Sequence, residues 1–121
     1  MKFQVLAITS DLFLQSRIIE LAKASRADTK IVTREEDLVA ETNSNNPSLV
    51  ILDLASTEYD PFSCAKALKS RSVPPRILAI YPHTRTDLRL RAQEAKIEYI
   101  SPNSSFLKTL KTILEKEVVR T

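Results

Sequence analysis

The sequence predicts a doubly wound α/β fold, in which a five-stranded parallel sheet lies between two layers of helices. One observation is that five short strand-like runs alternate with five helical segments, a spacing typical of right-handed crossovers. A second is the continuous apolar run Leu49–Leu52, which suits a strand buried on both faces. A third is Asp53, directly after that run. It is expected at the carboxyl edge of the sheet, where open α/β folds place their chemistry.

The predicted strands are short runs rich in apolar and β-branched residues. The turn-forming cluster Asn43–Pro47 precedes the central strand, and the polar run Ser101–Ser105 ends the last one. The strands are expected at residues 3–8, 29–33, 49–52, 76–81 and 97–100.

The predicted helices follow polar residues that can cap them. Asp11 stands before the first helix, and Thr33 and Glu36 have the spacing of a capping box at the second. Thr86 or Asp87 is suited to cap the fourth, and the fifth has the clearest apolar face. The helices are expected at residues 12–24, 34–42, 62–70, 88–96 and 106–119.

The composition indicates one cytoplasmic globular domain spanning residues 1–121. The chain is 43% hydrophobic, near the globular norm, and no apolar run approaches the length of a membrane span. The N-terminal residues read as a strand and not as a signal peptide. Cys64 is the single cysteine, so no internal disulfide forms, which fits a reducing compartment.

Residue usage excludes several functional classes. Glycine is absent from the sequence, which rules out the glycine-rich loops that bind dinucleotides and nucleoside triphosphates. His83 is the single histidine and has no cysteine cluster near it, so a zinc site is not supported. Ser10 lacks a nucleophile-elbow motif, so hydrolase chemistry is not supported either. We therefore do not expect an enzyme.

Charge is distributed unevenly along the chain. Residues 1–60 carry 6 Lys/Arg and 10 Asp/Glu, whereas residues 61–121 carry 12 and 5. The basic second half is compatible with an acidic or nucleic-acid partner. Its charges are scattered, which favours an ordinary solvated surface over a nucleic-acid interface.

Three segments resemble the receiver domain of bacterial two-component response regulators. Ser48–Leu54 resembles the strand that ends in the phosphoacceptor aspartate, and Ile77–His83 resembles the fourth strand and the loop after it. Glu94–Ile100 resembles the approach to the fifth strand. The resemblance covers about residues 2–119 and implies a flavodoxin-like strand order of 2-1-3-4-5.

The resemblance implies a role for each site residue. Asp53 would be the phosphoacceptor. Asp11, Asp53 and the main-chain carbonyl of Ala55 would hold Mg²⁺. A small hydroxyl residue at the end of strand four and a lysine after strand five would bind the phosphoryl oxygens.

This sequence departs from that pattern at several positions. Ser10 replaces one residue of the family's acidic pair, and Tyr81 replaces the small hydroxyl residue. Either Ser101 or Pro102 takes the place of the lysine. Losing the lysine removes a charge-assisted hydrogen bond of about 1.5–3 kcal/mol. The departures imply weak Mg²⁺ binding and a degenerate, phosphorylation-independent receiver.

Simpler structural roles remain open for these residues. Asp53 can be a loop or cap aspartate at a strand end, and Asp11 can be an N-cap. Tyr81 and Tyr99 can stack and lock one conformational state, or can be ordinary half-buried tyrosines.

A basic surface near the fourth helix is the predicted interaction face. Arg85, Arg89 and Lys96 have spacing near four or seven, which places them on one side of that helix. Lys96 also stands where receivers usually have glycine. The resemblance assigns this neighbourhood to protein partners, such as a histidine kinase, a downstream effector or a second copy of the chain.

Three functions follow, in order of preference. The first is a pseudo-receiver that has lost efficient phosphorylation and acts by protein contact. The second is a phosphorylatable switch that uses Asp53 with Mg²⁺. The third is a nucleic-acid accessory module, which requires steeply salt-dependent binding.

Overall fold

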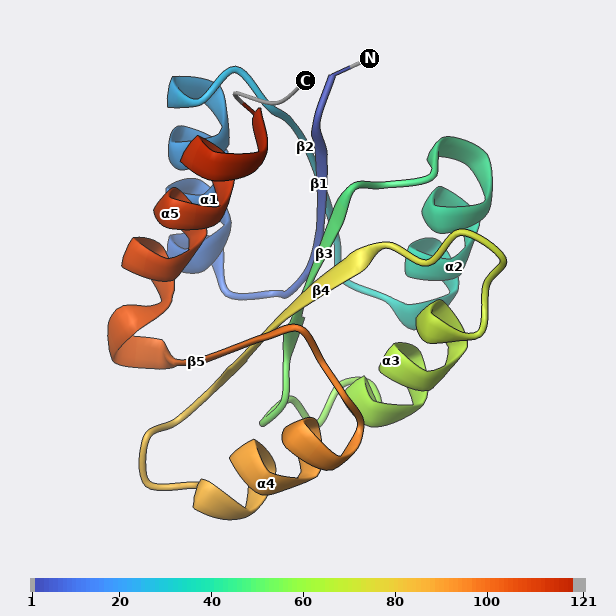
Figure 1. The fold of residues 1–121 in the computed structure, drawn as a ribbon, viewed down its shortest axis with the longest axis vertical. Helices are drawn as coiled ribbons and strands as arrows, with labels where there is room; N and C mark the ends of the chain where they lie inside the picture. The colour runs from blue at the N-terminus through green and yellow to red at the C-terminus, as the bar shows by residue number, and fades with distance from the viewer. Residues whose placement is uncertain (1, 119–121) are drawn as a thin grey trace.

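Five parallel strands form the centre of the protein. The computed structural model describes residues 2–118. The order of the strands is β2-β1-β3-β4-β5 and all four neighbouring pairs are parallel, so the predicted topology is confirmed (Figure 1). The strands are β1 (Gln4–Ile8), β2 (Asp28–Val32), β3 (Leu49–Asp53), β4 (Arg76–Tyr81) and β5 (Tyr99–Pro102).

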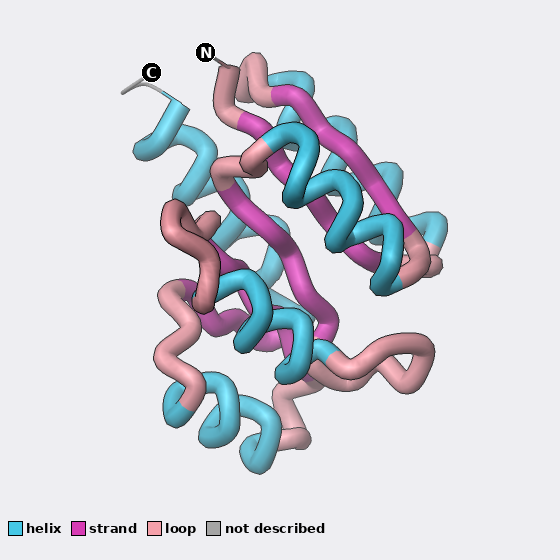
Figure 2. Tube along the Cα trace, turned by 90° about the vertical axis from the view of Figure 1, so that its right-hand side faces the viewer, coloured by secondary structure: helices cyan, strands magenta, loops and turns pink. Residues whose placement is uncertain are grey.

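Helices cover both faces of the sheet, as Figures 1 and 2 show. One layer packs α1 and α5 against the sheet, and the other packs α2, α3 and α4. None of the helices within residues 2–118 is long and apolar enough to cross a membrane. The helices are α1 (Leu12–Ala24), α2 (Glu35–Asn45), α3 (Pro61–Lys69), α4 (Thr86–Glu94) and α5 (Phe106–Val118).

The central strand β3 explains why its sequence is continuously apolar. Leu49 and Ile51 pack in the α1/α5 layer, while Val50 and Leu52 pack in the α2/α3/α4 layer. Successive side chains of a strand point to opposite faces, so burial of both faces requires an unbroken apolar run. The run ends at Asp53, which therefore lies at the centre of the sheet's carboxyl edge.

The predicted boundaries of the second helix are wrong. Arg34 and not Thr33 is the N-cap of α2, and no side chain caps that end. The helix also continues through the first part of the predicted turn cluster to Asn45. It ends because Asn46 adopts a left-handed conformation with φ 45°, which asparagine tolerates better than most residues.

The last strand begins two residues later than expected and includes Pro102. Helix α4 ends at Glu94, and Lys96 then takes a left-handed conformation with φ 58°. The Ile97 N–H donates to the Ala92 carbonyl at 3.1 Å, closing the helix end. Residues 95–98 therefore form the turn, and Ser101 belongs to the strand. The expected end of the last helix at Val119 lies outside the described residues.

Candidate functional site

The last residue of β3, Asp53, is the centre of the candidate site. Its side chain is half-buried. Its Oδ1 accepts a hydrogen bond from the Ala55 N–H at 3.0 Å, which orients the carboxyl group toward the β3–α3 loop. Burial raises the pKa of the Asp53 carboxyl, and the nearby Asp11 carboxylate raises it further, while the Ala55 hydrogen bond opposes both.

Two hollows meet at Asp53 and Asp11. The first, the loop hollow, has a volume of about 210 Å³ and lies beside the β3–α3 loop. The second, the helix hollow, has a volume of about 230 Å³ and lies between the start of α1 and the start of α5. Both are large enough for a small polyatomic group. Ala55 lines the loop hollow only.

The N-cap role considered for Asp11 is present in the structure. Its Oδ1 accepts a hydrogen bond from the Leu14 N–H at 3.1 Å, and its backbone is extended, as an N-cap requires. Capping fixes the carboxylate at the end of β1, beside Asp53. The residue therefore stabilises α1 and also lines both hollows.

Ser10 is bonded to an acidic residue that the sequence analysis did not single out. Its hydroxyl donates to Glu58 Oε1 at 2.6 Å. Glu58 comes from the β3–α3 loop and lines the loop hollow. Even so, no three His, Cys, Asp or Glu side chains within residues 2–118 gather closely enough to hold a metal ion.

Tyr59 is a second site residue that sequence reasoning missed. Its hydroxyl accepts from the Asp53 N–H at 2.8 Å and lies 3.3 Å from the Ile8 carbonyl. Burial raises the pKa of this phenol well above its usual value. The sequence signal was only an aromatic residue in an otherwise polar loop, and such a signal does not predict where the hydroxyl points.

Of the two alternatives considered for Tyr81 and Tyr99, stacking does not occur in the structure. Tyr99 pairs with Leu78 on β4, whereas Tyr81 pairs with Pro102 on β5, an offset of three residues. An odd offset places two side chains on opposite faces of a sheet. Tyr81 accordingly packs in the α2/α3/α4 layer and Tyr99 in the α1/α5 layer.

The end of β5 and the segment that follows it provide no cation to the site. Ser101 is buried, and its hydroxyl accepts from Thr109 at 3.2 Å in α5. Asn103 is the residue that lines the helix hollow. Lysine lines neither hollow, and Arg17 of α1 is the one cationic residue among the linings of the two.

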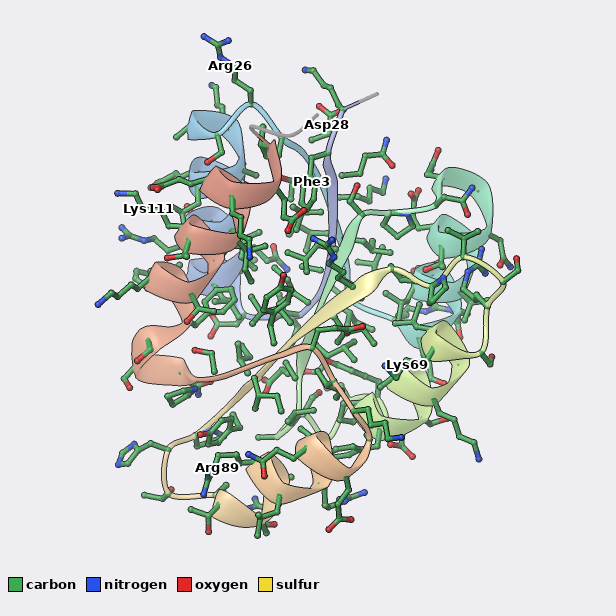
Figure 3. All side chains as sticks on the ribbon, in the orientation of Figure 1. Phe3, Arg26, Asp28, Lys69, Arg89 and Lys111 are labelled. Atoms are coloured by element: carbon green, nitrogen blue, oxygen red, sulfur yellow. The ribbon has the colours of Figure 1, made fainter. Side chains whose placement is uncertain are left out.

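Only part of the predicted basic face is available to contact a partner protein. Arg85 forms a two-point ion pair with Asp87, at 2.9 and 3.0 Å. Lys96 lies beyond the end of α4, so it does not share a helix side with Arg89. Arg89 is exposed on α4 (Figure 3).

Comparison with known proteins identifies the fold. The sequence matches no protein-family model and no curated protein. Solved response regulator structures match over nearly the whole chain. A signal receiver domain from Bermanella marisrubri is 15% identical with a TM-score of 0.84, covering 98% of this chain and 99% of its own.

Two further solved structures match this chain over nearly its whole length. A putative response regulator from Chloroflexus aurantiacus is 12% identical with a TM-score of 0.85, covering 99% of this chain and 100% of its own. The receiver domain of a DNA-binding response regulator from Colwellia psychrerythraea is 21% identical with a TM-score of 0.79. The match covers 94% of this chain and 99% of its own. The chain therefore has the fold of a response regulator receiver domain.

Proposed function

We propose that this chain is a receiver-type signalling domain that acts by contact with a partner protein and has lost efficient phosphorylation. The partner would be a histidine kinase or a downstream effector, and the domain would not itself be an enzyme. The observation that carries the proposal is that lysine lines neither hollow beside Asp53. A phosphoryl group there would lack the lysine that receiver chemistry uses.

Two other departures support a degenerate site. Tyr81 is buried in the α2/α3/α4 layer, where its ring is held by packing. It is therefore poorly placed to act as a small mobile hydroxyl. At the end of β1, serine stands in place of one residue of the acidic pair, and the Ser10 hydroxyl donates to Glu58. The end of β1 therefore offers only one acidic residue, Asp11.

Mg²⁺ would be held weakly by this set of residues. The available oxygens are those of Asp11, Asp53 and the Ala55 carbonyl, which fits the one or two carboxylates that Mg²⁺ commonly uses in proteins. When bound, the ion would neutralise phosphoryl charge. Because one carboxyl oxygen of Asp11 already caps α1 and one of Asp53 accepts from Ala55, we expect low affinity.

A phosphorylatable switch is the second candidate. It is favoured by the position of Asp53, which lines two hollows and uses only Oδ1 in its hydrogen bond to Ala55.

A nucleic-acid accessory role ranks last. Contact through the exposed Arg89 of α4, with a partner or a second copy of the chain, fits the first candidate best.

The test is a titration with Mg²⁺ and beryllofluoride, a phosphoryl mimic, followed by amide NMR. We expect little change at Asp53 and Asp11 at millimolar Mg²⁺. Saturable shifts centred on these two residues, absent from Asp53→Asn, would support the phosphorylatable switch instead.

A further inference from the structure

Arg17 is a cationic residue that shares the helix hollow with Asp53. It lies on α1, is exposed, and lines the helix hollow together with Asp53, Asp11 and Asn103. Among residues 2–118 it forms no ion pair; its guanidinium lies 5.9 Å from the centre of the Phe13 ring. The contact with Phe13 is long and exposed, so the guanidinium can be drawn away from it at little cost.

Phosphorylation would create a need for such a cation. In the reaction with acetyl phosphate, an Asp53 carboxylate oxygen attacks phosphorus and the bond from phosphorus to the acetyl oxygen breaks. Its electron pair leaves with acetate. The product is an acyl phosphate whose phosphoryl oxygens carry about two negative charges. The Asp11 carboxylate repels that charge, and Asn103 offers only a neutral amide.

We propose that Arg17 neutralises a phosphoryl group on Asp53 from α1, in place of the lysine missing after β5. The inference rests on the proposed function, since it concerns the residual phosphorylation of that degenerate site. The planar guanidinium suits a phosphoryl group because it can donate two parallel hydrogen bonds.

The other cations near this layer are less suitable. Lys111 of α5 lies within 3.9 Å of Glu115, and Figure 3 shows it on the outer side of that helix. Arg26 follows the far end of α1, away from the carboxyl edge of the sheet (Figure 3). Neither residue lines a hollow at Asp53. Lys23, in the last turn of α1, provides a matched control on the same helix.

The experiment measures the initial rate of Asp53 labelling by acetyl phosphate and Mg²⁺, by intact mass. We expect Arg17→Ala to lower the slow wild-type rate at least about tenfold. Arg17→Lys should retain an intermediate rate, and Lys23→Ala should stay within about twofold of wild type. Asn103→Lys added to Arg17→Ala should restore labelling, because it returns a cation to the same hollow; a purely structural role of Arg17 would not be rescued in this way.

The outcomes separate this inference from the proposed function. Equal rates in wild type and Arg17→Ala would overturn the role of Arg17 and leave the degenerate receiver intact. A fast labelling rate in wild type that is lost in Arg17→Ala would support the role of Arg17 and contradict a degenerate site. Absence of labelling in wild type and in every variant would overturn the role of Arg17, while contact-based signalling would stand.

Discussion

The hydroxyl of Tyr59 accepts a hydrogen bond from the Asp53 backbone N–H at 2.8 Å. The same hydroxyl lies 3.3 Å from the carbonyl of Ile8, the last residue of β1. The paired residues of β1 and β3 end at Ala7 and Ile51, so the phenol joins the two strands where their own pairing stops. A side chain from the β3–α3 loop thus fixes the backbone that carries the candidate phosphoacceptor.

Removing this hydroxyl should destabilise the protein. Tyr59→Phe keeps the buried ring but leaves the Asp53 N–H without its acceptor. We expect a loss of about 1–3 kcal/mol in the free energy of unfolding, the usual cost of an unsatisfied buried polar group. Urea denaturation measures the change, and amide exchange at Asp53 should accelerate.

The matched control is Tyr81→Phe. Tyr81 is equally buried, but its hydroxyl makes no hydrogen bond within residues 2–118. This variant should stay within about 0.5 kcal/mol of wild type. Equal losses in the two variants would show that the phenol does not hold the strand ends together.

Two substitutions of Asp11 should separate its capping role from its charge. Asp11→Ala removes the acceptor for the Leu14 N–H and should cost about 0.5–2 kcal/mol of stability. Asp11→Asn keeps a good N-cap and should retain most of that stability, while weakening Mg²⁺ binding as much as alanine does. Urea denaturation and Mg²⁺ titration provide the two measurements. If asparagine were as destabilising as alanine, charge and not capping would be the main contribution.

The raised pKa of Asp53 predicts how stability depends on pH. Burial raises this pKa above its ordinary value of 3.8, so the native state binds the proton more tightly than the unfolded chain. The resulting stability is complete below pH 3.8 and is lost as the pH rises through the native pKa. Asp53→Asn should therefore be more stable than wild type at pH 7, with an advantage that shrinks as the pH falls toward 4.

Unfolding free energies of the two proteins at a series of pH values test this prediction. Asparagine is a suitable replacement because its amide oxygen can still accept from the Ala55 N–H. A difference between the two proteins that stays constant from pH 7 to pH 4 would contradict the raised pKa.

Two arginines of α4 should behave differently. The Arg91 guanidinium lies 3.9 Å from the centre of the Phe62 ring in α3, whereas Arg89 is exposed and makes no such contact within the described chain. We expect Arg91→Ala to lower stability by about 0.5–1 kcal/mol and Arg89→Ala to leave it nearly unchanged. Thermal unfolding distinguishes them. Stable Arg89 variants could then be used to test α4 as a docking face.

The sequence predicted those features that depend on periodic burial. The continuous apolar run at Leu49–Leu52 and the alternation of elements were sufficient for the topology and for placing Asp53 at the sheet edge. Boundaries were less predictable because Asn46 and Lys96 end helices in left-handed conformations that are normally signalled by glycine, which this chain lacks.

The site was only partly predictable for a different reason. Asp11 and Asp53 could be placed because each stands at or within three residues of the end of a predicted strand. Tyr59 and Glu58 could not be placed, because they reach the site from a loop whose path depends on tertiary packing. The stacking considered for Tyr81 and Tyr99 could not be judged from the sequence because it depends on strand register, and the pairing of Tyr99 with Leu78 places Tyr99 on the face opposite to Tyr81.

The most direct test of a degenerate Asp53 site is to restore what it lacks. Ser10→Asp with Asn103→Lys returns the second acidic residue and a cation to the hollows beside Asp53. Beryllofluoride occupancy at fixed Mg²⁺, measured by amide NMR, should be low in the wild type and at least about tenfold higher in the double variant. Equal, high occupancy in both proteins would contradict the account, because the wild-type site would then be intact.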